Sequence, residues 1–363
     1  MCAPVIHKNP MARPDTQTRL AVDMIRKRLQ HGDHAAYPLP GERQLAVELG
    51  LSRPTVRKAI QQLSDEGVLT RGPSGRLAVG ADASGGGQRP LIAFLHPGQV
   101  TGESALWRDG VYTAAEENGA VVRSLGYEHY GDAIISAALE GFDGIFILPP
   151  SDEPLPALLA KRMQAARARV VVLDQDETRA GLRSVIVFPF ASGDKLLGHL
   201  HGLGHTRIDC LNIHPHNPVI EARIAGWKDF IERHGLSGEL LTMPADGSLL
   251  AAYKLMSARL KAGKPVAPAL YGITVHAAIG GMRALHEHGL RIGRDVSVCA
   301  VNDEGLGPYL VPSLTSLQTP SRSRYLRKAV DWMTHRVEWA KPTLVQPKDA
   351  PLFVGESTGL APK

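Results

Sequence analysis

Two arginines, Arg53 and Arg57, supply the type of side chain with which proteins read DNA bases. Residues four apart on a helix lie on the same face, so both guanidinium groups would point to one side, with Thr55 near them. An arginine can donate two hydrogen bonds to the O6 and N7 atoms of guanine in the major groove. We therefore predict that this face contacts base edges, and that Arg43, which precedes it in the chain, contacts phosphate.

The residues around these arginines predict a helix-turn-helix that would position them. Apolar side chains recur at helical spacing on two consecutive segments, at Leu45, Ala46 and Leu49 and then at Val56, Ile60 and Leu63. Between the segments, Gly50 supplies the turn, and Ser52 is of a type that caps the start of a helix. We include Ser52 with Thr55 among the predicted DNA contacts.

A two-stranded wing is predicted directly after the second helix. The segments 68–71 and 76–79 have the composition of short strands, and the Gly-Pro-Ser-Gly sequence between them predicts a turn. Gly75 and Arg76, at the end of this turn, complete the predicted set of DNA contacts.

The positive charge of the chain is concentrated in the same region. Residues 1–80 contain 12 Lys and Arg against 7 Asp and Glu, a net charge of +5, whereas residues 81–363 contain 29 of each kind. The whole formal charge of +5 therefore lies on the predicted DNA-binding segment, as an electrostatic footprint for phosphate binding requires.

The domain organisation follows from composition. We expect residues 1–14 to be a disordered arm, residues 15–80 the DNA-binding domain, and the glycine-rich residues 81–89 a flexible linker. The glycines could also mean a phosphate-binding loop, but the Gly-Lys-Ser/Thr sequence that such a loop needs does not follow them. Residues 90–363 then form a second, larger domain.

Neither a metal ion nor another cofactor is expected. The three cysteines, Cys2, Cys210 and Cys299, are too few and too scattered for a disulfide framework or a zinc site. His286 and His288 lie two apart on a predicted helix, so they point to different faces and cannot bind one metal ion together. With neither a signal-peptide core nor an apolar stretch of membrane length, a soluble cytoplasmic protein is expected.

Beyond the linker, apolar runs of strand length alternate with segments of helical periodicity, which is typical of an α/β fold with parallel sheets. Strands are predicted at 91–96, 120–125, 144–148, 170–174, 207–213, 239–243, 269–273 and 296–302. Helices are predicted at 105–118, 131–140, 154–166, 191–203, 219–234, 249–262 and 275–288. Two successive sets of these units indicate two doubly wound α/β lobes, which bind ligands outside the carboxyl ends of strands or between the lobes.

Both parts of the chain resemble known families. Residues 39–76 resemble the winged-helix domain of GntR-family regulators, through Leu-Pro-x-Glu-Arg, Leu-Ala, Leu-Ser-Arg-x-x-Val-Arg and Leu-x-x-Glu-Gly. Residues 90–360 resemble the effector-binding core of LacI/GalR repressors, which is itself similar to periplasmic sugar-binding proteins. The matching pieces lie at 203–208, 223–227, 289–298, 312–316 and 356–358. The pairing is similar to the arabinose-repressor type, and the resemblance implies a homodimer that binds operator DNA and a small polar effector.

The resemblance also implies where the effector binds. The positions that would contact it are Trp107, Arg108, Asp174, Asn217, Glu221, Arg223, Thr274, His276 and Asn302. Three alternatives stay open: a solvated loop acid for Asp174, a buried structural pair for Arg223, and a surface or dimer residue for Trp107. Thr274 and Asn302 stand where the family has Asn and Asp, and no cluster of Arg and Lys marks a phosphate pocket, so we expect a neutral polyhydroxy ligand such as a sugar.

The leading hypothesis is a DNA-binding transcriptional regulator, a repressor, that a small effector controls. An enzyme built on the α/β part is the alternative, but the sequence lacks a Gly-x-Ser-x-Gly elbow, a Walker sequence and a Gly-x-Gly-x-x-Gly after the first strand. A receptor for a transported sugar would need a signal peptide.

Overall fold

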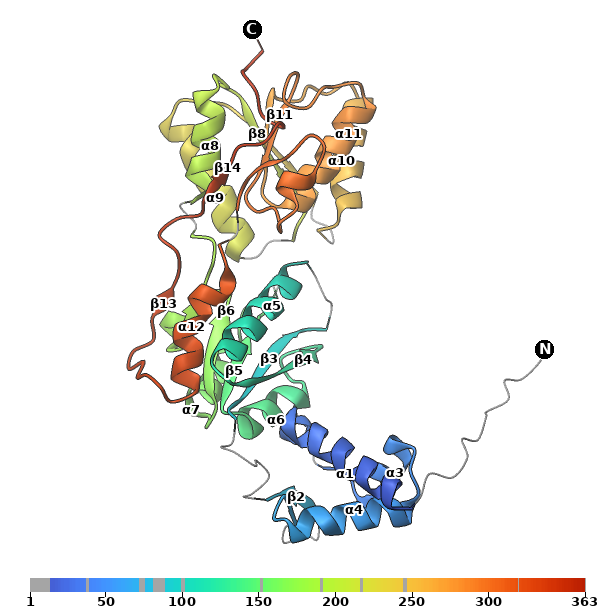
Figure 1. The fold of residues 1–363 in the computed structure, drawn as a ribbon. Helices are drawn as coiled ribbons and strands as arrows, with labels where there is room; N and C mark the ends of the chain where they lie inside the picture. The colour runs from blue at the N-terminus through green and yellow to red at the C-terminus, as the bar shows by residue number, and fades with distance from the viewer. Residues whose placement is uncertain are drawn as a thin grey trace, which may run out of the picture.

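The computed structural model comprises a helical head with a small wing and two α/β lobes (Figure 1). It describes residues 14–36, 39–71, 76–80, 89–98, 102–150, 153–189, 192–215, 218–243, 247–318 and 320–362. Most of the predicted arm and linker, together with Gly75 and Asn217, lie outside these ranges. Within them, none of the helices combines the length and the apolar character needed to cross a lipid bilayer.

The head contains the predicted helix-turn-helix. Its helices and strands are α1 (Pro14–Gln30), α2 (Asp33–Ala36), α3 (Glu42–Leu49), α4 (Arg53–Asp65), β1 (Leu69–Arg71) and β2 (Leu77–Val79). Gly50 adopts a left-handed conformation (φ 65°) that ends α3, and the Ser52 side chain accepts a hydrogen bond from the Thr55 amide at the start of α4. The apolar stripes of α3 and α4 bury against Ile25 of α1. The strands β1 and β2 pair antiparallel as a wing.

The first lobe is a parallel sheet between two layers of helices. From one edge to the other its strands run β13 (Leu344–Val345), β7 (Arg183–Val185), β6 (Arg169–Leu173), β5 (Gly144–Ile147), β3 (Leu91–Pro97) and β4 (Val121–Tyr127). The helices are α5 (Gly102–Glu117), α6 (Ala133–Gly141), α7 (Ala157–Ala165) and α12 (Arg322–Met333). Side chains alternate between the faces of a strand, so Phe94 packs into one core layer and Leu95 into the other.

The second lobe repeats this plan. Its sheet order is β14 (Leu352–Phe353), β12 (Thr315–Leu317), β11 (Ser297–Ala300), β10 (Ala269–Gly272), β8 (Ile208–Asn212) and β9 (Leu240–Thr242). Only β14 among these strands pairs antiparallel. The helices are α8 (Gly193–Gly202), α9 (Pro218–Arg233), α10 (Leu249–Lys261) and α11 (Val275–Glu287).

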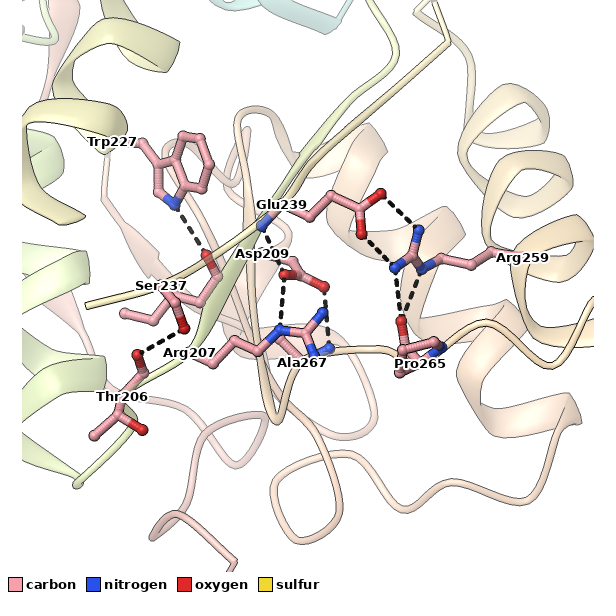
Figure 2. Close-up of polar contacts among 10 residues, drawn as sticks. Thr206, Arg207, Asp209, Trp227, Ser237, Glu239, Arg259, Pro265 and Ala267 are labelled. Carbon is pink, nitrogen blue, oxygen red and sulfur yellow. Dashed lines mark hydrogen bonds and ion pairs between the residues drawn. The ribbon is translucent and has the colours of Figure 1, made fainter. Parts of the chain in front are cut away.

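A buried carboxylate holds the starts of three strands of this second sheet together. Asp209 is fully buried, and its carboxylate accepts hydrogen bonds from the backbone amides of Glu239, 2.9 Å away, and Ala267, 3.0 Å away (Figure 2). Glu239 in turn forms a two-pronged ion pair with Arg259 of α10. These contacts lie at the end of the sheet opposite the carboxyl ends of its strands, so we assign them to stability rather than to ligand binding.

The two sets of α/β units are not strictly successive, unlike the prediction. After β12 the chain leaves the second lobe, adds α12 and β13 to the first lobe, and returns as β14 (Figure 1). The apolar face of α12, which includes Leu326 and Val330, explains this excursion because it completes the core over the first-lobe sheet. The lobes are thus joined by three connections, an arrangement that permits hinge motion.

Candidate DNA-binding surface and ligand cleft

The two predicted reading arginines lie together on the solvent side of α4. Their side chains are 60% exposed for Arg53 and 65% exposed for Arg57. Both bind the carboxylate of Glu42, the first residue of α3: Arg53 Nε lies 2.9 Å from Oε1, and Arg57 Nε lies 3.1 Å from each carboxylate oxygen. One carboxylate from α3 therefore holds the donors of both arginines on α4 side by side.

Glu42 was not among the predicted contacts. Its hydrogen bonds with Arg57 and Arg53 lower the pKa of its carboxyl, so that Glu42 stays ionised beside the arginines. The sequence signal was available, because Glu42 belongs to the Leu-Pro-x-Glu-Arg motif. The glutamate of this motif also sets the geometry of the two arginines.

The remaining predicted DNA contacts surround this pair. Arg43 is exposed in the first turn of α3, and Arg76 is exposed at the start of the second wing segment. The hydroxyls of Ser52 and Thr55 lie 2.7 Å apart, so each has a partner at the start of α4. This places donors at the start of α4, at α3 and at the wing, as a winged helix needs to contact a groove and the flanking phosphates.

Asp174 lies where the two lobes face each other. It follows β6 directly and adopts a left-handed conformation (φ 62°), which is uncommon for a residue with a side chain. Burial raises the pKa of its carboxyl to about 7, the charge of Glu103 acts in the same direction, and Arg223 and Arg322 oppose them. A strained backbone and a perturbed carboxyl in a cleft together mark a candidate binding site.

Arg223 of α9 reaches the same place from the second lobe. Its Nη1 donates a hydrogen bond of 2.8 Å to the Ile273 carbonyl, which fixes the side chain, and its guanidinium lines a cavity of about 30 Å³ together with Asp174 and Tyr271. That is room for about two water molecules. Arg223 thus has a structural contact and a cleft position at once, whereas Glu221 is exposed in the first turn of α9.

Three predicted residues of the second lobe gather at the start of α11. Thr274 caps this helix, since its hydroxyl accepts from the Ala277 amide, and lies 3.0 Å from His214 Nε2. Asn302 accepts from the Val275 amide at 3.2 Å. Both are more than nine-tenths buried, so in this conformation their acceptors hold α11 in place. His276, in the first turn of α11, has its Nδ1 3.9 Å from a Glu304 carboxylate oxygen.

Trp107 and Arg108 occupy different environments although they are adjacent. Trp107 is fully buried, and the Arg322 guanidinium carbon lies 5.2 Å from the centre of its ring. Arg108 is exposed and lies 3.4 Å from the Asp109 carboxylate. In this conformation the Trp107 ring is fully buried and has no open face for stacking on a sugar.

Glu103, Arg322 and Glu304 were missed as cleft residues. Arg322, the first residue of α12, donates a hydrogen bond to Glu103 of α5. Sequence reasoning had no means to pair them, because the excursion of the chain through α12 brings together residues that are 219 positions apart.

Within the described residues, no group of three or more His, Cys, Asp and Glu side chains has the arrangement of a metal site. Cys210 and Cys299 are buried free thiols on β8 and β11, with β10 between them. Burial raises the pKa of both thiols, so they remain protonated.

Comparison with known proteins matches both parts of the chain to families. Residues 16–79 match the family of bacterial regulatory proteins described as gntR, and residues 197–358 match the periplasmic binding protein-like domain. The chain is 26% identical over 220 residues to the HTH-type transcriptional regulator AscG of Escherichia coli, with 60% of this chain and 61% of that protein covered. It is also 26% identical over 204 residues to the lactose operon repressor of the same organism, with 56% and 55% covered. These matches span less than two thirds of either relative's length.

Solved structures agree with the fold. The lac repressor dimer bound to operator and the anti-inducer ONPF superposes with a TM-score of 0.62 at 21% identity, over 77% of this chain and 97% of that chain. A LacI family regulator from Arthrobacter in complex with lactose gives a TM-score of 0.62 at 18% identity, over 75% of this chain and the whole of that one. At identities this low, the superpositions establish the two-lobed architecture and nothing further.

Proposed function

We propose that this chain, which joins a gntR-type helix-turn-helix to a periplasmic binding protein-like domain, is a cytoplasmic transcriptional repressor that binds operator DNA and is controlled by a neutral sugar. The observation that carries the proposal is the pair of exposed arginines on α4, held by one carboxylate in the head that bears the net positive charge of the chain.

The head would read DNA in two ways. Lys and Arg side chains attract the phosphates and set the orientation, with Arg43 beside the groove, while Arg53 and Arg57 contact base edges in the major groove. Their attachment to Glu42 keeps both guanidinium groups extended before DNA arrives. Less side-chain freedom is then lost on binding, which favours affinity.

A single winged helix contacts too little DNA for the affinity of a specific regulator, so two heads on a two-fold operator are required. We therefore propose a homodimer. The lac repressor dimer, which shares the two-lobed architecture, binds its operator in that state.

The effector would bind between the lobes and contact Asp174 and Arg223. The cavity beside these two side chains, of about 30 Å³, admits no sugar, so binding there would be coupled to a change in how far the lobes are separated. Such a change can re-aim a pair of heads, and the effector and operator must then alter each other's affinity by the same factor. That lactose and sucrose occupy regulators of this architecture supports the choice of a sugar.

The proposal is tested by binding of the full-length protein to fragments of the DNA upstream of its own gene, with and without a panel of neutral mono- and disaccharides. We expect protection of a two-fold symmetric site at a concentration at least a thousandfold below that needed for scrambled DNA, and release by at least one sugar. Failure to prefer any fragment over scrambled DNA would reject the proposed function.

A further inference from the structure

The head is held against the first lobe by a contact that is separate from the linker between them. The carboxylate of Asp33, at the start of α2, forms an ion pair of 2.8 Å with Arg123 on β4. The preceding residue, Gly32, lies against the side chain of Leu91, and α2 itself contacts α6. We call the contact of residues 32–36 with Leu91, Arg123 and α6 the α2 latch.

The α2 latch is tightly packed around Gly32. This glycine is buried and has a φ of 73°, a conformation that residues with a side chain rarely adopt. The three atoms nearest to a side chain built at this position all belong to Leu91 and Arg123 of the first lobe. Nδ1 of His34, the next residue but one, is also buried, and burial lowers the pKa of this histidine. Both the turn and the contact with the lobe therefore require glycine at position 32.

The linker enters the first lobe at the same corner. Arg89 Nε donates a hydrogen bond of 2.9 Å to the Gly119 carbonyl, and the Leu91 amide donates one of 2.8 Å to the Asp143 carboxylate. A flexible chain of nine residues, the length of 81–89, spans about 15–18 Å, so the linker alone would leave the head free to turn. It also makes docking intramolecular, at an effective concentration on the order of millimolar. A small contact is then enough to keep the head docked.

The α2 latch and the ligand cleft lie at opposite ends of the first-lobe sheet. Leu91 begins β3 and Arg123 is near the beginning of β4, whereas Asp174 follows the carboxyl end of β6. All the pairings among these parallel strands run through one sheet that is packed on both faces, and such a packed body moves as a unit. A docked head therefore follows the first lobe, whereas a head held only by a flexible linker would not respond to the movement of the lobes.

Docking leaves the DNA-reading surface open. With the head docked, the side chains of Arg53 and Arg57 are 60% and 65% exposed. Figure 1 shows α4 on the side of the head that faces away from the lobes. The α2 latch thus orients the head without covering the residues that would contact DNA, which argues against an autoinhibitory role.

We propose that the α2 latch joins the head and the first lobe into one rigid unit, and that through it the movement of the lobes sets the spacing and the angle of two paired heads. This inference rests on the proposed sugar-controlled function and names the contact through which that control acts. The linker then serves only as a tether.

The first experiment measures docking without DNA or sugar. ¹⁵N relaxation of the full-length protein compares the rotational correlation time of amides in α1 and α3 with that of amides in β3 and β5. We expect one shared value in the wild type. Arg123→Glu places two carboxylates opposite each other and should shorten the value for the head alone. Combining it with Asp33→Arg restores an ion pair with exchanged charges and should restore the shared value.

Arg167→Glu is the matched control, because it makes the same change of charge at an exposed residue before β6, away from the α2 latch. It should leave the head docked. A wild-type head that tumbles faster than the lobes, or an Arg123→Glu head that still tumbles with them, would overturn the proposal. Should Arg123→Glu unfold, Asp33→Arg alone breaks the same pair from the side of the head and takes its place.

The second experiment measures control of DNA binding. The probes are the protected upstream fragment, a fragment that carries one half of its two-fold site, and D-glucose, D-xylose, L-arabinose, lactose and sucrose. A sugar that releases the wild type should change its operator affinity by about 5- to 150-fold, as is usual for coupled sites. In Arg123→Glu this factor should fall toward one, and the exchanged pair should restore it. Binding to the single half-site should be the same in all of these proteins.

The outcomes separate this inference from the proposed function. A sugar response that is unchanged in a variant whose head tumbles freely would reject the α2 latch as the route of control and leave the proposed function intact. A wild-type protein that prefers no DNA fragment, although its head and lobes tumble together, would reject the proposed function and leave the docking of the head intact.

Discussion

The carboxylate of Asp33, in the head, lies 2.8 Å from the guanidinium of Arg123 on β4 of the first lobe. Next to this ion pair, Gly32 turns the chain with a positive φ of 73°, and a methyl group in its place would come within 2.9 Å of Leu91. The short helix α2 that follows contacts α6 of the first lobe. The head therefore touches the first lobe directly, and a movement of that lobe can reach α4 through α1 and α2.

The docking contact can be measured with a double-mutant cycle. Asp33→Asn and Arg123→Gln each remove one charge of a partly exposed pair, so the coupling free energy between them should be about 0.2–1 kcal/mol at low salt and smaller in 1 M NaCl. Urea unfolding of the wild type, both single variants and the double variant gives this value. A coupling of zero at low salt would show that the pair does not hold the head against the lobe.

Arg53→Ala and Arg57→Ala should each weaken operator binding about ten- to hundredfold, because a base edge loses its donors. The loss of affinity should arise at the one or two base pairs that the arginine contacts. Changing those base pairs in the operator should therefore weaken binding by the variant only slightly. Fluorescence anisotropy with wild-type and substituted operators at fixed salt measures both effects. Arg43→Ala is the matched control for a phosphate contact. It should weaken all sequences alike and reduce the slope of log K against log salt by about one.

Glu42→Gln separates the orientation of the arginines from their charge. Both arginines remain, but the ionised partner that holds them is gone, and a negative charge near the DNA is removed. We expect tighter binding to scrambled DNA and a smaller ratio of operator to scrambled affinity. An unchanged ratio would mean that Glu42 only stabilises the contact between α3 and α4. Glu48→Gln on the same helix, paired with Arg28 instead, controls for loss of charge.

Asp174 should make the stability of the protein depend on pH. Its pKa is raised from 3.8 to about 7 in the folded state, so the folded state holds a proton that the unfolded chain releases. The resulting stabilisation is complete below pH 4 and disappears as the pH rises from about 4 to about 7. Asp174→Asn lacks it, so its free energy of unfolding relative to wild type should increase between pH 4 and pH 8 in urea titrations. A relative stability that is flat over this range would contradict the burial of this carboxyl.

The sequence predicted the elements well and the cleft less completely, for physical reasons. Strands such as Leu91–Pro97 are apolar on both faces because helices cover both sides of the sheet, and that pattern is visible in the sequence. The meeting of Glu103 with Arg322 depends on a connection between lobes that no local pattern encodes. Thr274, which stays a predicted ligand contact, also caps α11, a role that its place before a helical segment indicates.

The exposed apolar loop at residues 306–311 offers a test of the proposed dimer. Tyr309 is 83% exposed and Val311 is 96% exposed, and Leu306 lies beside them in the sequence. Apolar side chains gathered in this way are typical of an interface, so Val311→Glu should shift the protein toward monomer in sedimentation velocity and weaken operator binding, since one head alone binds poorly. Leu158→Glu on α7 is the control, because Leu158 is 73% exposed in a different part of the molecule and should leave the dimer intact. A wild-type protein that is monomeric at micromolar concentration, with and without DNA, would contradict the dimer itself. A dimer unaffected by Val311→Glu would place its interface elsewhere.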